Sequence, residues 1–147
     1  MVVRILTEPF DPWQTVQAHQ RAHLAPGSYG ATALFVGTMR DFNQGDTVQA
    51  MTLEHYPGMT ERFLEQISRQ AAERWDILDS LICHRVGPLN PDDPIVLVAV
   101  WSAHRADAFD ASRWLMEELK SRAPFWKKEV TTEGERWVEN EGSGTRN

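Results

Sequence analysis

The segment from Leu119 to Glu129 holds basic and aromatic residues whose types and spacing could do chemistry. Lys120 and Lys127 stand seven positions apart, with a proline and two aromatic residues between them. Apolar bulk beside an ammonium group removes water from it, which favours an amine that can attack an electrophile or transfer protons. The pattern therefore predicts a partly dry pocket in which ammonium groups hold an anion or take part in a reaction.

A purely structural explanation exists for each lysine taken singly. Lys120 is expected at the end of a helix, where a positive charge favours the helix dipole. Lys127 and Lys128 alternate in an extended segment, so only one of them can face the same side as Lys120. The other is expected to be solvated.

Two further groups of basic residues follow predicted strands. His104 and Arg105 stand where a strand leads into a helix, and a helix N-terminus already carries partial positive charge. Adding cations there does little for stability but suits an anion such as phosphate, which arginine binds with two hydrogen bonds. A solvated pair on a surface turn is the alternative. Arg40 follows Gly37, which allows a ligand close to the backbone, although a surface ion pair explains Arg40 taken alone.

Composition excludes several classes of function. The chain of 147 residues suffices for one domain, and its charge of 15 − 21 = −6 is unfavourable for general nucleic-acid or anionic-membrane binding. The longest apolar run, residues 95–101, is too short to cross a bilayer. The single cysteine, Cys83, cannot form an intramolecular disulfide and indicates a cytoplasmic protein. No metal site is expected, because four of the histidines lack metal-ligand spacing and are interpreted as surface or packing residues: His19, His23, His55 and His84.

Hydrophobic periodicity predicts an α+β fold in which about three helices pack on one mixed sheet. The expected helices are residues 12–24, 60–75 and 106–119. The expected strands are residues 1–6, 31–36, 48–56, 77–86 and 95–101, with a hairpin or edge strand at 129–138. Residues 38–46 are expected to form a loop. We expect a single domain over residues 1–140 and a flexible polar tail over 141–147.

Four motifs together resemble the large, catalytic subunits of molybdopterin synthase. They occur in the family's order and spacing, and the likeness runs from Gly30 to Glu139. Met39 departs from the family pattern, which has a smaller β-branched residue there, and the tail is shorter and more acidic than is usual. The motifs are Phe35 to Arg40, Leu53 to Glu61, Ser102 to Arg105 with Ala108 and Phe109, and Leu119 to Glu129.

The resemblance implies a hammerhead-like α/β fold and a sulfurtransferase of molybdenum cofactor biosynthesis. In this family a small ubiquitin-like carrier brings sulfur as a thiocarboxylate on its C-terminal Gly-Gly, and its tail enters a pocket of the large subunit. Two sulfurs pass to cyclic pyranopterin monophosphate and form the dithiolene of molybdopterin. The resemblance also implies a homodimer of large subunits within a heterotetramer, with no cofactor, no nucleic acid and no membrane.

The resemblance also implies roles for individual residues. Lys120 would orient the thiocarboxylate and transfer protons, and Lys127 would bind substrate or stabilise developing negative charge. The substrate's phosphate would be anchored by Arg40, His104 and Arg105, and flanking residues that would line the same pocket are Thr38, Met39, Lys128 and Glu129.

A non-catalytic module that holds an anion or a partner's C-terminal carboxylate is the alternative to an enzyme. Such a module would need Arg40 and Arg105 but would have little reason to keep Lys120 beside a proline and two aromatic rings. The sequence therefore favours the enzyme.

Overall fold

The computed structural model describes residues 1–43 and 45–138, so the predicted tail at 141–147 lies outside the described residues. The three predicted helices are confirmed, each within three residues of its expected ends. No helix in the described ranges combines the length and apolar character needed to span a membrane. The elements in chain order are β1 (Val2–Leu6), α1 (Pro12–His23), β2 (Ala31–Thr38), β3 (Phe42–Asn43), β4 (Asp46–His55), α2 (Met59–Arg74), β5 (Asp79–Arg85), β6 (Gly87–Leu89), β7 (Pro94–Ser102), α3 (Arg105–Arg122), β8 (Phe125–Thr131) and β9 (Gly134–Val138).

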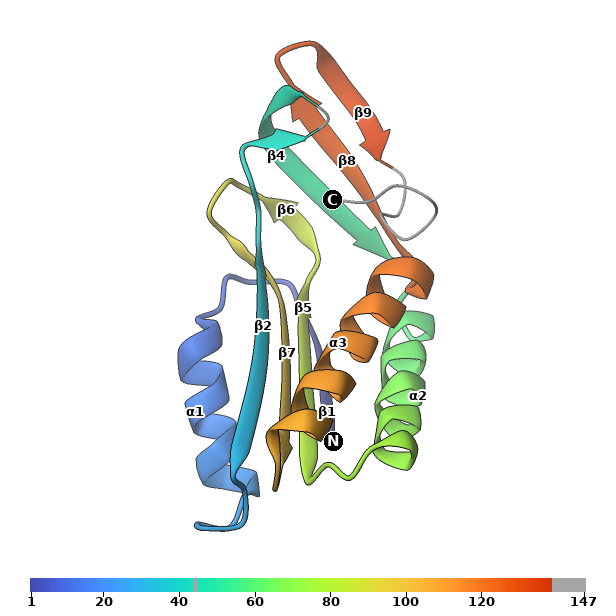
Figure 1. The fold of residues 1–147 in the computed structure, drawn as a ribbon. Coiled ribbons are helices and arrows are strands. Elements are labelled where there is room, and N and C mark those ends of the chain that lie inside the picture. The colour runs from blue at the N-terminus through green and yellow to red at the C-terminus, as the bar shows by residue number, and fades with distance from the viewer. Residues whose placement is uncertain (44, 139–147) are drawn as a thin grey trace.

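The first sheet is mixed and has the strand order β1-β5-β7-β2, with β1 parallel to β5 and the other pairs antiparallel. Helix α1 covers one face, and α2 and α3 cover the other (Figure 1). The continuous apolar run in β7 makes it a central strand that is buried on both faces, as the sequence predicted. The hydrophobic core around this sheet therefore consists of two clusters, one on each face of β7.

The remaining strands form a second sheet, whereas the sequence predicted one. Its order is β3-β4-β8-β9, and β6 also pairs with β4. The backbone of Gly87 has φ 89°, which directs the chain after β5 out of the first sheet and into β6. Strand β3 occupies part of the segment expected to be a loop. Strands of two or three residues carry no periodicity, so the sequence pattern could not reveal β3 or β6.

The end of α3 leads directly into the second sheet. The N–H of Ala123 still bonds the carbonyl of Leu119 at 3.2 Å, and Pro124 then prevents the helix from continuing. Helix α3 is anchored by Leu115 and Leu119, which are buried in the core beneath it. This anchoring brings the last turn of α3 next to the first residues of β8.

Candidate active site

A cavity of about 390 Å³ lies where the second sheet meets β2 and the end of α3. Its wall is contributed by β2, β3, β4, β5, β7, α3, β8 and β9, so it draws on both sheets. Three of its side chains are cationic: Arg40 after β2, Lys120 from the last turn of α3 and Lys127 from β8. These cations are widely separated in sequence, and the fold brings them to one cavity.

Aromatic and aliphatic side chains surround these cations. Phe125 and Trp126, which the sequence placed beside Lys120, line the same cavity as its ammonium group. Both Lys120 and Lys127 are half-buried. Since charge–charge interactions strengthen where water is excluded, such a wall attracts an anion more strongly than a solvated basic surface would. The apolar part of the wall is formed largely by Phe35, Met39, Met51, Leu53, Phe125 and Trp126.

The two neighbouring lysines of β8 point in opposite directions, as the alternation of a strand requires. Lys127 lines the cavity, whereas Lys128 is absent from its wall. The Nζ atom of Lys128 lies 2.9 Å from Oε2 of Glu135 and 5.8 Å from the ring centroid of Trp137. The structure therefore does not bring Lys128 to the predicted substrate site.

Three other predicted site residues do line the cavity: Thr38, Met39 and Glu129. Met39 is buried, and its N–H donates to the carbonyl of Asp93 at 2.9 Å, which fixes the backbone just before Arg40. The carboxylate of Glu129 is also buried and accepts a hydrogen bond from the side-chain amide of Asn43 at 3.0 Å. The cavity therefore contains one buried anionic group among its cations.

His104 and Arg105 lie at the opposite end of α3 from Lys120. Arg105 is the first residue of the helix, and His104 precedes it. The 15 positions between Arg105 and Lys120 correspond to about 22 Å of helix rise. Both side chains are exposed, and neither lines the cavity. Within a single chain these two predicted phosphate anchors are therefore separated from the cavity that holds the lysines.

His84 lines the cavity although the sequence indicated only a surface or packing role. It is buried, and its ring stacks on Phe125 with 4.0 Å between centroids. Its Nδ1 lies 2.8 Å from the carbonyl oxygen of Arg85, so Nδ1 carries the proton. Burial lowers the pKa of His84 to about 4 despite the hydrogen bond to the Arg85 carbonyl, which acts to raise it, and the charge of Lys127 contributes to the lowering. His84 is thus a neutral imidazole, and only the packing of β5 against β8 reveals its place at the site.

The buried neutral state of His84 predicts a loss of stability in mild acid. The unfolded chain binds a proton near pH 6.5, but the folded protein binds it only near pH 4. The unfolding free energy therefore falls as the pH drops through this window, by about 3 kcal/mol in total. Burial also lowers the pKa of His19, which adds to the loss.

Urea denaturation at several pH values between 7 and 4.5 measures this loss. A His84→Gln variant should lose clearly less stability over the same range than the wild-type protein, because one of the two buried histidines no longer titrates. An unchanged pH slope in that variant would contradict the buried neutral state.

The fold and the cavity define an α+β protein with a cationic, partly apolar site suited to an anionic ligand that also has a flat or apolar part. The family model described as MoaE protein matches residues 5–122, and the chain belongs to this family. The predicted fold class, α+β with three helices, is confirmed by the elements of the structure and by the solved structure described below.

Individual relatives and a solved structure agree with this assignment. The chain is 58% identical over 110 residues to the molybdopterin synthase catalytic subunit of Ralstonia nicotianae, covering 75% of this chain and 62% of that protein. It is 51% identical over 139 residues to the molybdopterin synthase catalytic subunit of Pseudomonas aeruginosa, covering 95% and 91%. The structure of the molybdopterin biosynthesis MoaE protein from Burkholderia ambifaria matches with a TM-score of 0.80 and 48% identity, covering 97% of this chain and 91% of that one.

Proposed function

We propose that this chain is the catalytic subunit of a molybdopterin synthase. It would transfer sulfur from the C-terminal thiocarboxylate of a small ubiquitin-like carrier to cyclic pyranopterin monophosphate. The observation that carries this proposal is the meeting of Lys120, Lys127 and Arg40 on one half-apolar cavity wall. The names of the relatives support it, since a catalytic subunit implies at least one other subunit.

The proposed reaction assigns each cation a task. The thiocarboxylate sulfur attacks a side-chain carbon of the pterin, and a C–S bond forms as a C–O bond at that carbon breaks and its oxygen leaves. Water then cleaves the acyl–sulfur bond to leave a thiolate on the pterin and a carboxylate on the carrier, and a second thiocarboxylate supplies the second sulfur in the same way. Lys120 would orient the thiocarboxylate and transfer the protons of these steps, while Lys127 would stabilise the negative charge that develops. Arg40 would bind the phosphate of the substrate.

The state of Cys83 supports delivery of sulfur from outside the chain. Its side chain is fully buried in the cluster between the first sheet and α1. Burial raises the pKa of the Cys83 thiol to about 11, so it holds its proton at neutral pH and is a poor nucleophile. A chain whose one thiol is protected in this way suits a reducing compartment, and we place the reaction in the cytoplasm.

A single-turnover assay tests the proposed function. The protein is mixed with thiocarboxylated carrier and cyclic pyranopterin monophosphate, and the dithiolene product is measured. Product formation at a rate above that of the carrier and substrate alone is the expected result. Tight binding of the carrier without product would instead favour a non-catalytic module that holds the carrier's C-terminus.

We also propose a homodimer, in which a second copy would bring His104 and Arg105 to the cavity. Strand β2 is an edge strand of the first sheet, and two of its apolar side chains, Leu34 and Phe35, are exposed. Phe109 of α3 is 64% exposed, close to His104 and Arg105 in sequence. Exposed apolar residues at an open sheet edge are typical of a surface that pairs with another chain.

Mixed dimers provide the test for this arrangement. Arg105→Ala and Lys120→Ala should each impair turnover as pure dimers. If Arg105 serves the cavity of the other copy, a dimer with one chain of each kind keeps one intact site. Co-expressed mixtures should then recover about one quarter of wild-type activity, since about half of the dimers are mixed. No recovery above the two parent variants would show that Arg105 does not serve the cavity of the other copy.

A further inference from the structure

On the basis of the function proposed above, we propose that Arg136 is a positioning residue for this site. It holds the β3–β4 hairpin, which follows Arg40, against the cavity wall and compensates the negative charge of Glu129. Arg136 does not itself line the cavity, and it lies outside the four motifs that carry the family resemblance.

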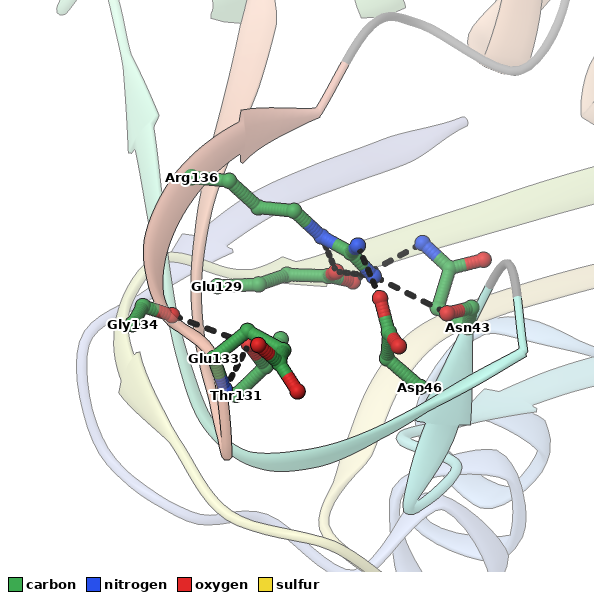
Figure 2. Close-up of polar contacts among 7 residues, drawn as sticks. All are labelled: Asn43, Asp46, Glu129, Thr131, Glu133, Gly134 and Arg136. Atoms are coloured by element: carbon green, nitrogen blue, oxygen red, sulfur yellow. Dashed lines mark hydrogen bonds and ion pairs between the residues drawn. The ribbon is translucent and has the colours of Figure 1, made fainter.

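The guanidinium of Arg136 connects three strands of the second sheet (Figure 2). From β9 it donates through Nη1 to Oδ2 of Asp46 at 2.6 Å, and through Nη2 to the carbonyl of Asn43 at 2.9 Å. Its Nε donates to Oε1 of Glu129 at 3.1 Å, on the neighbouring strand β8. The planar guanidinium fork suits this arrangement, because it presents several donors in fixed directions.

Glu129 depends on this network for its place in the wall. Its side chain is only 6% exposed, and the two carboxylate oxygens are bound by Arg136 and by the amide of Asn43. A buried carboxylate is tolerated only when it is paired and hydrogen-bonded. Burial acts to lower the pKa of Arg136, but hydrogen bonds to Asp46 and Glu129 outweigh it and raise that pKa, so the compensating charge is permanent.

The charge balance of the cavity follows from this pairing. Among the described residues, the wall contains three cations, which are Arg40, Lys120 and Lys127, and one carboxylate, that of Glu129. Arg136 lies outside the cavity and pairs with that carboxylate. The cavity therefore keeps an excess of positive charge and attracts an anion. Without Arg136, the carboxylates of Glu129 and Asp46 would face the same space with no cation between them.

The β3–β4 hairpin has little stability of its own. In the part of the hairpin that the structure describes, β3 pairs with β4 at two positions, Phe42 with Thr47 and Asn43 with Asp46. Arg136 binds both members of the second pair. The guanidinium of Arg40 lies over the ring of Phe42, 4.9 Å from its centroid. The position of this substrate anchor is therefore coupled to the hairpin and, through it, to Arg136.

Amide hydrogen exchange without substrate tests the positioning role. The N–H of Val48 bonds the carbonyl of Asp41 at 2.8 Å across the base of the hairpin and serves as the reporter. In Arg136→Gln it should exchange about tenfold faster or more than in the wild-type protein. The control is Arg113→Gln, which removes the same charge from an exposed ion pair with Glu117 on α3. Unchanged exchange at Val48 would overturn the positioning role.

Substrate kinetics test the charge role. Arg136→Gln should raise KM for cyclic pyranopterin monophosphate about tenfold, with a smaller change in kcat. Adding Glu129→Gln to this variant should recover most of the lost affinity, because the carboxylate that still lacks Arg136, that of Asp46, does not line the cavity. Arg136→Lys is expected to keep KM within about threefold of wild type but to show the faster exchange, since an ammonium cannot bind all three acceptors.

The outcomes separate this proposal from the function on which it rests. A wild-type KM in Arg136→Gln, or a double variant as impaired as the single one, would overturn the charge role while sulfur transfer stands. Absence of turnover in the wild-type protein would overturn the proposed function, and exchange at Val48 would still decide the positioning role. Should Arg136→Gln fail to fold, Arg136→Lys carries the exchange test alone.

Discussion

Replacing Lys120 with alanine is expected to lower the single-turnover rate of dithiolene formation by about 10³-fold. The ammonium group is half-buried in the cavity wall, next to Phe125 and Trp126 and on the same wall as Lys127. No solvent molecule can replace a cation held at that position, so the two roles proposed for Lys120, proton transfer and orientation of the thiocarboxylate, would be lost together. The rate is measured with saturating carrier and substrate, so that weaker binding does not mask the chemical step.

The fold should survive the loss of Lys120. The residue lies in the last turn of α3, where its interaction with the helix dipole contributes about 0.5 kcal/mol. The matched control is Arg122→Ala in the same turn, whose exposed guanidinium lies 2.7 Å from Glu118. This control should retain near-normal turnover, and both variants should keep a melting temperature close to wild type. Near-normal turnover in Lys120→Ala would exclude Lys120 from the mechanism.

Local patterns in the sequence predicted the parts of the fold that depend on local physics. The apolar residues of α2 recur at helical spacing, and Leu64, Ile67 and Ala71 indeed form its buried face. The uninterrupted apolar run of β7 predicted a strand covered on both sides. The change from α3 to an extended strand follows from Pro124, whose ring prevents a further helical turn.

Features that depend on pairing between distant segments could not be predicted in this way. The separation into two sheets arises because β6 pairs with β4, a choice that no local pattern encodes. His84 reaches the cavity through the packing of β5 against β8. Arg136 binds Asp46 and Asn43, which lie about 90 positions away in the chain, whereas local pattern rules compare residues only a few positions apart. The sequence pattern therefore could not predict the roles of His84 and Arg136.

One discrepancy could have been foreseen from the sequence. The predicted helix over residues 106–119 already placed Arg105 and Lys120 at its two ends, and the rise of an α-helix separates such residues by about 20 Å. A shared substrate site for both within one chain was therefore excluded by helix length alone. The same length, combined with the exposed edge of β2, supports the homodimer proposed above.

The two neighbouring lysines of β8 offer a second large and well-controlled effect. Lys127→Ala is expected to lower turnover by about 10²-fold, because its ammonium group faces the cavity and would stabilise charge that develops on the substrate. Lys128→Ala removes the same charge from the next residue of the same strand. Its ammonium group instead pairs with Glu135 on the other face, so turnover should stay within about twofold of wild type.

The comparison is informative because net charge and position along the chain are almost the same in the two variants. A large loss in Lys127→Ala alone would show that the direction of the side chain decides function, as the alternation of β8 requires. Measuring kcat and KM separately distinguishes stabilisation of the transition state from simple attraction of the anion. Equal losses in both variants would mean that the summed charge of the strand matters, and Lys127 would then lose its assigned role at the reacting atoms.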